Sequence, residues 1–299
     1  MQDYVAVVGS ATMDMGGRPF APLIARDSNP GTVSFSPGGV GRNIAHNLRL
    51  LDVPVVFLTA LGEDAFAPAV ERGCADLGID LSRALRVPGG STSVYLYITD
   101  PGGDMALAVS DTAIARAISP AYLESVRDVL DGAALVMLEG NLGEDAIAWL
   151  GSNCKVPLFA DPVSVRKAER FRLALPKLHS FKPNRIEARL LTGEERPERA
   201  ARRLLELGVK RVFLSLGENG LLAAEGGDCL ELPNTPGKLV DATGAGDAMT
   251  AALARAYLDK LDLESGARFA LAAASIAIES RASVNPALSL EAVRRRAGL

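Results

Sequence analysis

Two kinds of hydrophobic pattern alternate along the chain. Short runs rich in valine, leucine and isoleucine predict buried strands at residues 4–8, 55–59, 134–138, 156–160 and 212–216. Between these runs, apolar residues recur every three or four positions and predict helices at residues 43–51, 65–77, 120–130, 144–150, 185–191 and 198–207. Strands that alternate with helices at this spacing are typical of a mostly parallel sheet covered on both faces. We therefore predict an α/β fold with a central sheet between two layers of helices.

Glycines follow several of the predicted helices. Gly78, Gly151, Gly193 and Gly208 each stand just past a helical pattern. Helices commonly end at a residue in the left-handed conformation, which glycine adopts without a steric penalty. We expect a C-cap at each of these four positions.

One region departs from the alternation of strands and helices. Residues 91–99, STSVYLYIT, and residues 105–109 are strand-like runs joined by the turn DPGGD, which predicts a β-hairpin. Residues 10–36 are irregular and rich in glycine and proline. We expect parts of 10–36 and 91–110 to form a small β-sheet beside the main body, a lid and the surface of a homodimer. A second hairpin at residues 220–232 is expected to extend one edge of the main sheet.

Composition and charge exclude several classes of protein. Hydrophobic residues make up 48% and charged residues 23%, as in globular proteins. The net charge is −4, and without a basic block we expect no nucleic-acid partner. The most apolar stretch, residues 269–278, is short of the roughly 20 residues of a membrane span. The N-terminal MQDYVAVVGS lacks a basic region, so we expect no secretion signal and a cytoplasmic location. Three scattered cysteines and two histidines predict neither a disulfide framework nor a metal cluster.

The strongest candidate for chemistry is the segment DATGAGD at residues 241–247. Gly244, Ala245 and Gly246 are small and come just before a helical pattern. Such a run presents unpaired backbone N–H groups to one point, where the helix dipole adds positive potential. This predicts an anion hole, with Asp247 placed to accept a proton from a hydroxyl group. An N-capping aspartate in an ordinary turn is the alternative, but three small residues exceed what capping needs.

A second glycine pair precedes a helix in the segment SPGGVGRNIAHNL, residues 36–48. Glycine at position 39 lets a substrate approach the backbone closely, and Asn43 can donate to and accept from a sugar hydroxyl. Asp14 follows the first predicted strand, and the carboxyl ends of strands are where open α/β sheets bind ligands. A tight turn capped by Asn43 and an exposed loop aspartate are the alternative readings.

The segment KPNRIE, residues 182–187, follows a short strand at Phe181. Lys182 can neutralise phosphate charge. Asn184 and Glu187 are three residues apart on one helix face and can hold hydrated Mg²⁺. Capping by Asn184 beside a solvated Glu187 is the alternative.

Together these residues resemble a known family. The glycine pair with Asn43 and the DATGAGD segment are similar to the two signatures of the ribokinase-like (PfkB) carbohydrate and nucleoside kinases, and the motif from Asn184 to Glu187 lies between them as in that family. The resemblance covers essentially the whole chain. It implies one ribokinase-like kinase domain over residues 1–299, a three-layer sandwich with a small β-sheet lid.

The resemblance also implies a role for each matched position. Asp247 would be the catalytic base beside the anion hole of Gly244, Ala245 and Gly246. The other positions would contact the two substrates and the cations: ribose at Asp14, Gly39 and Asn43; ATP at Lys182, Asn184, Ser215, Gly217, Gly220 and Asn285; Mg²⁺, through water, at Asn184 and Glu187; and a monovalent cation such as K⁺ at Asp241 and Thr243.

Longer segments extend the resemblance toward one substrate. Residues 27–48, 91–98, 161–168 and 182–193 are similar to members of the family that phosphorylate the ribose 5′-hydroxyl of pseudouridine with ATP, and Asn141 matches an asparagine that these members tend to keep. Ser93 is a further candidate for a substrate contact, because it lies on one face of the predicted lid strand; an ordinary solvated hairpin is the alternative. Glu139 instead matches a ribose-contacting glutamate of ribokinases. A ribokinase or a purine-nucleoside kinase is therefore the alternative. A non-catalytic nucleoside-binding protein is a third reading, which the intact Asp247 and its glycines disfavour.

Overall fold

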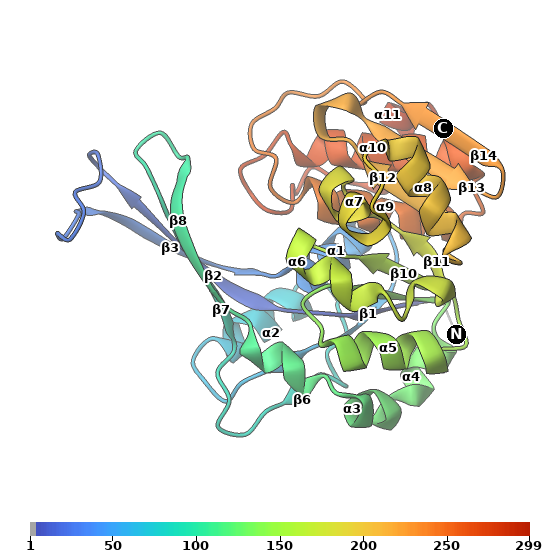
Figure 1. Ribbon diagram of the computed structural model, residues 1–299. Helices are drawn as coiled ribbons and strands as arrows, with labels where there is room; N and C mark the ends of the chain where they lie inside the picture. The colour runs from blue at the N-terminus through green and yellow to red at the C-terminus, as the bar shows by residue number, and fades with distance from the viewer. Residues whose placement is uncertain (1–3) are drawn as a thin grey trace.

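An eight-stranded sheet forms the centre of the computed structural model, which describes residues 4–299 (Figure 1). Its strands run in the order β14-β13-β12-β11-β10-β9-β1-β4. Parallel pairing joins every neighbour from β12 to β4, whereas β13 and β14 continue the sheet as an antiparallel hairpin. The strands are β1 (Val5–Val8), β4 (Val55–Leu58), β9 (Leu135–Glu139), β10 (Leu158–Asp161), β11 (Leu178–Phe181), β12 (Arg211–Ser215), β13 (Leu221–Glu225) and β14 (Asp228–Leu232). The predicted strands and the predicted edge hairpin are confirmed.

Helices cover both faces of this sheet. Successive residues of a strand point to opposite faces, so Val5 and Val7 join one hydrophobic core while Ala6 and Val8 join the other. The first core is covered by α1 (Val40–Leu50), α2 (Ala67–Ala75), α9 (Ala245–Leu258), α10 (Leu263–Ala277) and α11 (Leu290–Ala297). The second is covered by α3 (Pro120–Ser125), α4 (Arg127–Gly132), α5 (Glu144–Asn153), α6 (Val165–Ala168), α7 (Arg185–Thr192) and α8 (Pro197–Glu206). The predicted α/β fold with two helical layers is confirmed.

Two helical predictions need correction. The helix predicted over residues 120–130 is broken at Val126 into α3 and α4. The Ser125 hydroxyl donates to the Tyr122 carbonyl and competes with the helical hydrogen bond at this point. Gly151 is not a C-cap, because α5 continues through it to Asn153 and the glycine lets Ala174 pack close to the helix. The other three glycines do have positive φ, as expected.

A separate four-stranded sheet projects from the body (Figure 1), and we call it the lid sheet. Its order is β3 (Gly31–Gly38), β2 (Thr12–Pro19), β7 (Ser93–Thr99) and β8 (Met105–Asp111). The strand register places Asp14 beside Ser36 and Tyr95 on one face, and Met15 beside Phe35 and Leu96 on the other. The lid sheet therefore has one polar and one apolar face. A short parallel pair, β5 (Ala60–Leu61) and β6 (Leu85–Arg86), lies apart from both larger sheets.

Two findings bear on the expectations about membranes and secretion. In residues 4–299, no helix has both the length and the apolar character needed to cross a bilayer. The first three residues of the N-terminal segment, on which the expectation of no secretion signal rests, lie outside the described part of the chain.

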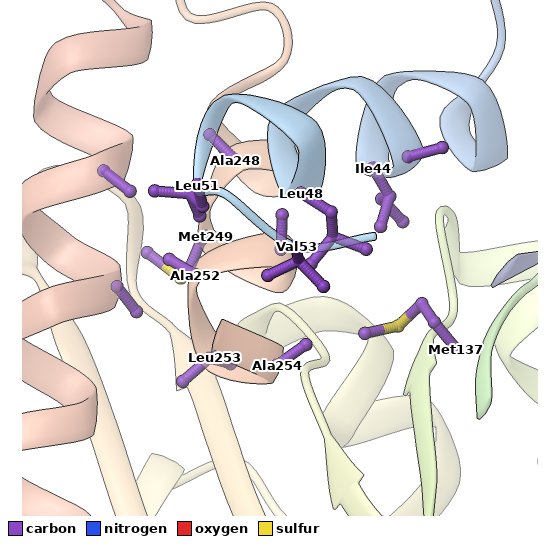
Figure 2. Packing of buried hydrophobic residues seen from close by; sticks show 14 of the residues in the cluster. Ile44, Leu48, Leu51, Val53, Met137, Ala248, Met249, Ala252, Leu253 and Ala254 are labelled. Carbon is purple, nitrogen blue, oxygen red and sulfur yellow. The ribbon is translucent and has the colours of Figure 1, made fainter. Parts of the chain in front are cut away.

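Helices α1 and α9 pack directly on one another above the sheet (Figure 2). Ile44, Leu48 and Leu51 extend from α1 at helical spacing and are completely buried. Ala248, Met249 and Ala252 of α9 belong to the same core, and the small alanines allow the two helices a close approach. This packing fixes the N-terminal turns of the two helices relative to each other.

Candidate active site

The N-terminus of α9 carries the candidate base. Its N-cap is Gly244, with φ 79°, and a Cβ atom built there would come within 1.8 Å of the Ser283 carbonyl oxygen. Only glycine fits this position without moving the chain. Asp247 is the third residue of α9, in the turn where backbone N–H groups have no helical partner. At Gly246 a Cβ would meet only the Lys182 ammonium, at 3.5 Å.

Asn43 lies against Asp247, although the two are far apart in the sequence. Its Nδ2 atom donates to Asp247 Oδ2 over 3.0 Å. Its Oδ1 atom is buried and has no hydrogen-bond partner among the described residues. Since α1 begins at Val40, Asn43 stands within the first turn and does not cap the helix. A carboxylate and an unsatisfied amide oxygen thus meet at one point.

The carboxyl ends of neighbouring parallel strands add charged groups beneath this pair. Glu139 ends β9, Asp161 ends β10 and Lys182 follows β11. Lys182 Nζ lies 3.1 Å from Asp161 Oδ2, and both side chains are less than a tenth exposed. Burial alone would lower the pKa of Lys182, but the ion pair with Asp161 raises it. The ammonium group is therefore held charged at the edge of the sheet.

The environment of Asp247 makes it a stronger base than an ordinary aspartate. Burial, and then the negative charge of Asp161, raise the pKa of Asp247 to about 8. The hydrogen bond from Asn43 and the charge of Lys182 oppose this rise, and Glu139 adds to it. A carboxyl group with such a pKa can both accept and release a proton near neutral pH.

A large cleft separates the polar face of the lid sheet from two loops of the body. Its volume is about 1060 Å³, and it is lined by Asp14, Arg42, His46, Tyr95, Tyr97 and Arg18, and by parts of residues 239–243 and 281–284. The Asp14 carboxylate accepts from the Thr12 hydroxyl over 2.6 Å. Burial raises the pKa of Asp14, against the effects of Thr12 and Arg42. The cleft can therefore hold a molecule with hydroxyl groups.

The glycines before α1 are required by the chain itself. Gly39 has φ 96°, and a Cβ there would lie 2.7 Å from the Ser10 carbonyl oxygen. A Cβ on the neighbouring Gly38 would collide with the Asp14 carboxylate. The glycine pair thus lets Asp14 lie flat against the start of the α1 segment.

The Asn184 and Glu187 pair forms a capping box on α7. Asn184 Oδ1 accepts from the N–H groups of Ile186 and Glu187, and Glu187 Oε2 accepts from the Asn184 N–H over 2.7 Å. The alternative prediction, that Asn184 caps the helix, is therefore confirmed, but its second part is wrong because Glu187 is buried and not solvated. Burial raises its pKa.

Magnesium would have to bind here with few protein ligands. Within residues 4–299 there is no group of three or more histidine, cysteine, aspartate or glutamate side chains that could hold a metal. Mg²⁺ keeps several waters and commonly uses one or two carboxylates together with substrate phosphates. Glu187, beside the phosphate-binding candidate Lys182, fits a metal held in this way.

Glu139 and Asn141 form a buried network behind the site. Glu139 is completely buried; its Oε1 accepts from the Ser10 N–H, and its Oε2 accepts from the backbone and side-chain N–H groups of Asn141. Asn141 Oδ1 in turn accepts from Lys167. Glu139 therefore ties the ends of β1 and β9 together. Ser93 is buried at the start of β7, where it pairs with Thr12.

The remaining predicted residues lie in turns at the same edge of the sheet. Ser215 ends β12, and its N–H donates to the Pro183 carbonyl. Gly217 and Gly220 both have positive φ, and a Cβ on Gly220 would collide with the Leu232 carbonyl oxygen. These glycines are needed by the turn between β12 and β13, whether or not a ligand approaches them.

Asn285, Asp241 and Thr243 belong to the two loops beyond the cleft. The Asn285 amide donates to the Ile276 carbonyl and accepts from the Ala287 N–H, so its polar atoms are used within the chain. Asp241 Oδ1 accepts from the Thr243 N–H over 2.8 Å. The expected ATP and cation roles of these residues stay predictions.

The sequence reasoning missed Asp161 and Thr250 as site residues. The Thr250 hydroxyl on α9 donates to Asp161 Oδ2 over 2.8 Å, and both residues are buried. Asp161 directly follows the strand predicted at residues 156–160, the same signal that singled out Asp14. Thr250 stands three residues after Asp247 and shares its helix face.

The chain is similar to known kinases over nearly its whole length. Residues 2–289 match the sequence pattern of the pfkB family of carbohydrate kinases. The pseudouridine kinase of Escherichia coli is 36% identical over 97% of this chain and 95% of its own length. A carbohydrate kinase from Agrobacterium tumefaciens is 26% identical, with a TM-score of 0.89 over 100% of this chain and 98% of that one. The ribokinase of Arabidopsis thaliana, solved with ribose and ATP, is 24% identical, and its TM-score of 0.88 over 100% of both chains shows the ribokinase fold.

Proposed function

The chain belongs to the pfkB family of carbohydrate kinases, and from this premise we propose that it transfers a phosphoryl group from ATP to the ribose 5′-hydroxyl of pseudouridine. Kinases of this family use ATP with Mg²⁺ and act on small sugars or nucleosides. The contact between Asp247 and Asn43 at the N-terminus of α9 carries the proposal, because it places a strong carboxylate base beside a helix N-terminus that favours anions.

Each group has a distinct part in the transfer. Asp247 takes the proton of the 5′-hydroxyl as the hydroxyl oxygen attacks the γ-phosphorus of ATP, and the bond from that phosphorus to the β,γ-bridging oxygen breaks, which releases ADP. The backbone N–H groups of Gly244, Ala245 and Gly246 stabilise the negative charge that develops on the phosphoryl oxygens. Lys182 adds a fixed positive charge. Asn184 and Glu187 would hold Mg²⁺ through water, and the ion would neutralise phosphate charge when bound.

Further ATP and cation contacts follow the family resemblance. We assign ATP to the edge formed by Ser215, Gly217, Gly220 and Asn285, and a monovalent cation such as K⁺ to Asp241 and Thr243. The position of Ser215 beside Asn184, linked by an isolated parallel bridge, supports the placing of the phosphates near both.

A nucleoside suits the cleft better than a free sugar. Tyr95 and Tyr97 lie next to each other on the polar face of the lid sheet, with ring centroids 5.8 Å apart, and both line the cleft. Aromatic rings of this kind stack on planar bases. Asp14, Gly39 and Asn43 would hold the ribose, while Ser93 and Asn141 are the candidates for further substrate contacts. The likeness to the E. coli pseudouridine kinase supports pseudouridine among the nucleosides.

We also propose that two copies of the chain associate through the apolar face of the lid sheet. Val33, Phe35, Leu107 and Val109 are each more than half exposed there. The same patch on a second copy would cover them through a two-fold axis.

The proposed function is tested with a panel of acceptors and ATP, by measuring ADP formation. Pseudouridine should exceed uridine and ribose in kcat/KM by at least about 100-fold, because a site built for the extra ring N–H of pseudouridine leaves a polar group unpaired with uridine. A higher kcat/KM for ribose, inosine or adenosine would reject pseudouridine and keep the kinase. Absence of ADP formation with every acceptor would reject the kinase as well.

A further inference from the structure

Asp161 makes more polar contacts than its place at a strand end requires. Its Oδ2 atom lies 3.1 Å from Lys182 Nζ and accepts from the Thr250 hydroxyl over 2.8 Å. Its Oδ1 atom accepts from the Val163 N–H over 2.8 Å. The residue itself is 5% exposed. One buried carboxylate thus joins the end of β11, the first turns of α9 and the turn after β10.

The turn after β10 is strained. Val163 has φ 68°, a conformation that a β-branched residue rarely adopts. Such strain persists only where surrounding contacts impose it, and it concentrates at functional sites. Here the hydrogen bond from Val163 to Asp161 holds the turn and fixes the direction of the carboxylate.

We propose that Asp161 is a positioning residue for phosphoryl transfer, which holds the Lys182 ammonium group beside Gly246 of the anion hole and sets a fixed negative charge among the groups around Asp247. This inference rests on the proposed kinase reaction and on the role of Asp247 in it. It concerns the two carboxylate oxygens of Asp161, whose partners are Lys182, Thr250 and Val163. The inference therefore does not depend on which nucleoside is the substrate.

The charges around Asp247 explain why an aspartate is needed at position 161. Glu139 and Asp161 face Asp247 from the ends of β9 and β10, Lys182 faces it from the end of β11, and Asn43 donates to it from α1. Asp161 offsets the positive charge of Lys182, which would otherwise stabilise the Asp247 carboxylate and weaken it as a base. An asparagine in its place would turn an N–H group toward either Lys182 or the Val163 N–H.

The test is the pH dependence of kcat/KM in Asp161→Asn. With the negative charge removed, Asp247 should lose its proton more readily. The acid limb of the profile should then move to lower pH by about one pH unit. Lys182→Gln should move the limb in the opposite direction, because it removes the positive charge that favours the Asp247 carboxylate. We expect kcat of Asp161→Asn to fall by about 10-fold or more, as for a lost positioning contact.

Thr250→Val is the matched control. It removes one hydrogen bond from the same Asp161 oxygen and leaves every charge in place, so it should lower Tm without moving the acid limb. A purely structural role for Asp161 predicts the same behaviour for Asp161→Asn. An unmoved limb in Asp161→Asn would therefore overturn the proposal.

A second set of variants tests the proposal if Asp161→Asn alone is poorly active or unstable. Asp161→Asn with Lys182→Gln removes both buried charges together, which is better tolerated than leaving one unpaired. The acid limb of the kcat/KM profile of this double variant should lie at lower pH than that of Lys182→Gln alone. The Tm difference between each protein and its Asp247→Asn derivative, followed against pH, reports the same titration without turnover. If Asp247 titrates at the same pH in Asp161→Asn as in the wild type, the inference is contradicted, and this holds even if no nucleoside is phosphorylated.

Discussion

The surroundings of Asp247 disfavour the charged form of its carboxyl group, compared with an aspartate in water. The native protein holds the Asp247 proton up to about pH 8, whereas the unfolded chain releases it near the ordinary value of 3.8. Between these values the native state binds more protons than the unfolded state, so this group lowers the free energy of unfolding as pH rises. The basicity needed for proton transfer is thus obtained at a cost in stability at alkaline pH.

Asp247→Asn should separate these two effects. The amide cannot accept the hydroxyl proton, so kcat should fall by about 10²–10⁴-fold. The amide does not ionise, so above pH 8 the variant should be more stable than the wild type, with Tm higher by about 2 °C or more. Rate assays and thermal melts at pH 5 and pH 9 check both, and the gain in Tm should shrink at the lower pH. More than a third of wild-type kcat in the variant would remove Asp247 from the reaction.

Helices and strands were predictable where their pattern is local. The continuous apolar run of β1 and the helical spacing of apolar residues in α1 indicate which residues are buried, and the structure follows them. The break at Val126 was missed because it depends on the direction of one side chain, the Ser125 hydroxyl, which the apolar pattern does not contain. The burial of Gly151 was missed because it depends on Ala174, a partner distant in sequence. The same limit applied to the site: the motifs marked Asp247 and Asn43 singly, but only the packing of α1 on α9 brings them together.

Asp64 connects the lid sheet to the body. Its carboxylate accepts from the N–H and hydroxyl of Thr92, just before β7, and from the N–H groups of Phe66 and Ala67 at the start of α2. Burial would raise the pKa of Asp64, but these hydrogen bonds outweigh it and lower the pKa. The stabilisation is therefore present above the ordinary value of 3.8 and is lost as pH falls through the lower folded value.

Asp64→Ala should weaken both α2 and the base of the lid sheet. We expect Tm at pH 7 to fall by about 2–4 °C, as for the loss of a helix cap of about 1 kcal/mol. The difference should shrink toward pH 3. The KM for the acceptor should rise more than the KM for ATP, because the cleft lies under the lid sheet. Asp80→Ala is the control, since the exposed Asp80 carboxylate accepts from a single group among residues 4–299, the Ser82 N–H. An equal loss of Tm in that variant would contradict the role of Asp64.

At the scale of the whole molecule, charged and polar side chains gather at the carboxyl end of the central sheet. Glu139 and Asp161 end β9 and β10, Lys182 follows β11 and Ser215 ends β12. The polar face of the lid sheet, with Asp14 and the two tyrosines, lines the cleft together with residues 239–243, just before α9. The other lid face has no comparable cover within the described chain, and its strands β3 and β8 are exposed along almost their whole length. A single sheet that is open on its apolar face loses the burial that holds strands together. Association of two copies would supply that burial and hold the lid sheet over each cleft.

Phe35→Asp combined with Val109→Asp tests this association. Both side chains are 61% exposed on the apolar lid face, and two buried carboxylates without partners would oppose pairing. Light scattering should give twice the chain mass for the wild type and a single chain mass for the variant. The variant should also have a higher KM for the acceptor, because an unsupported lid sheet closes the cleft less well. Leu173→Asp, at a residue 69% exposed outside the lid sheet, should leave the mass unchanged. A wild-type protein of single chain mass at assay and millimolar-range concentrations would show that the lid sheet works without a second copy.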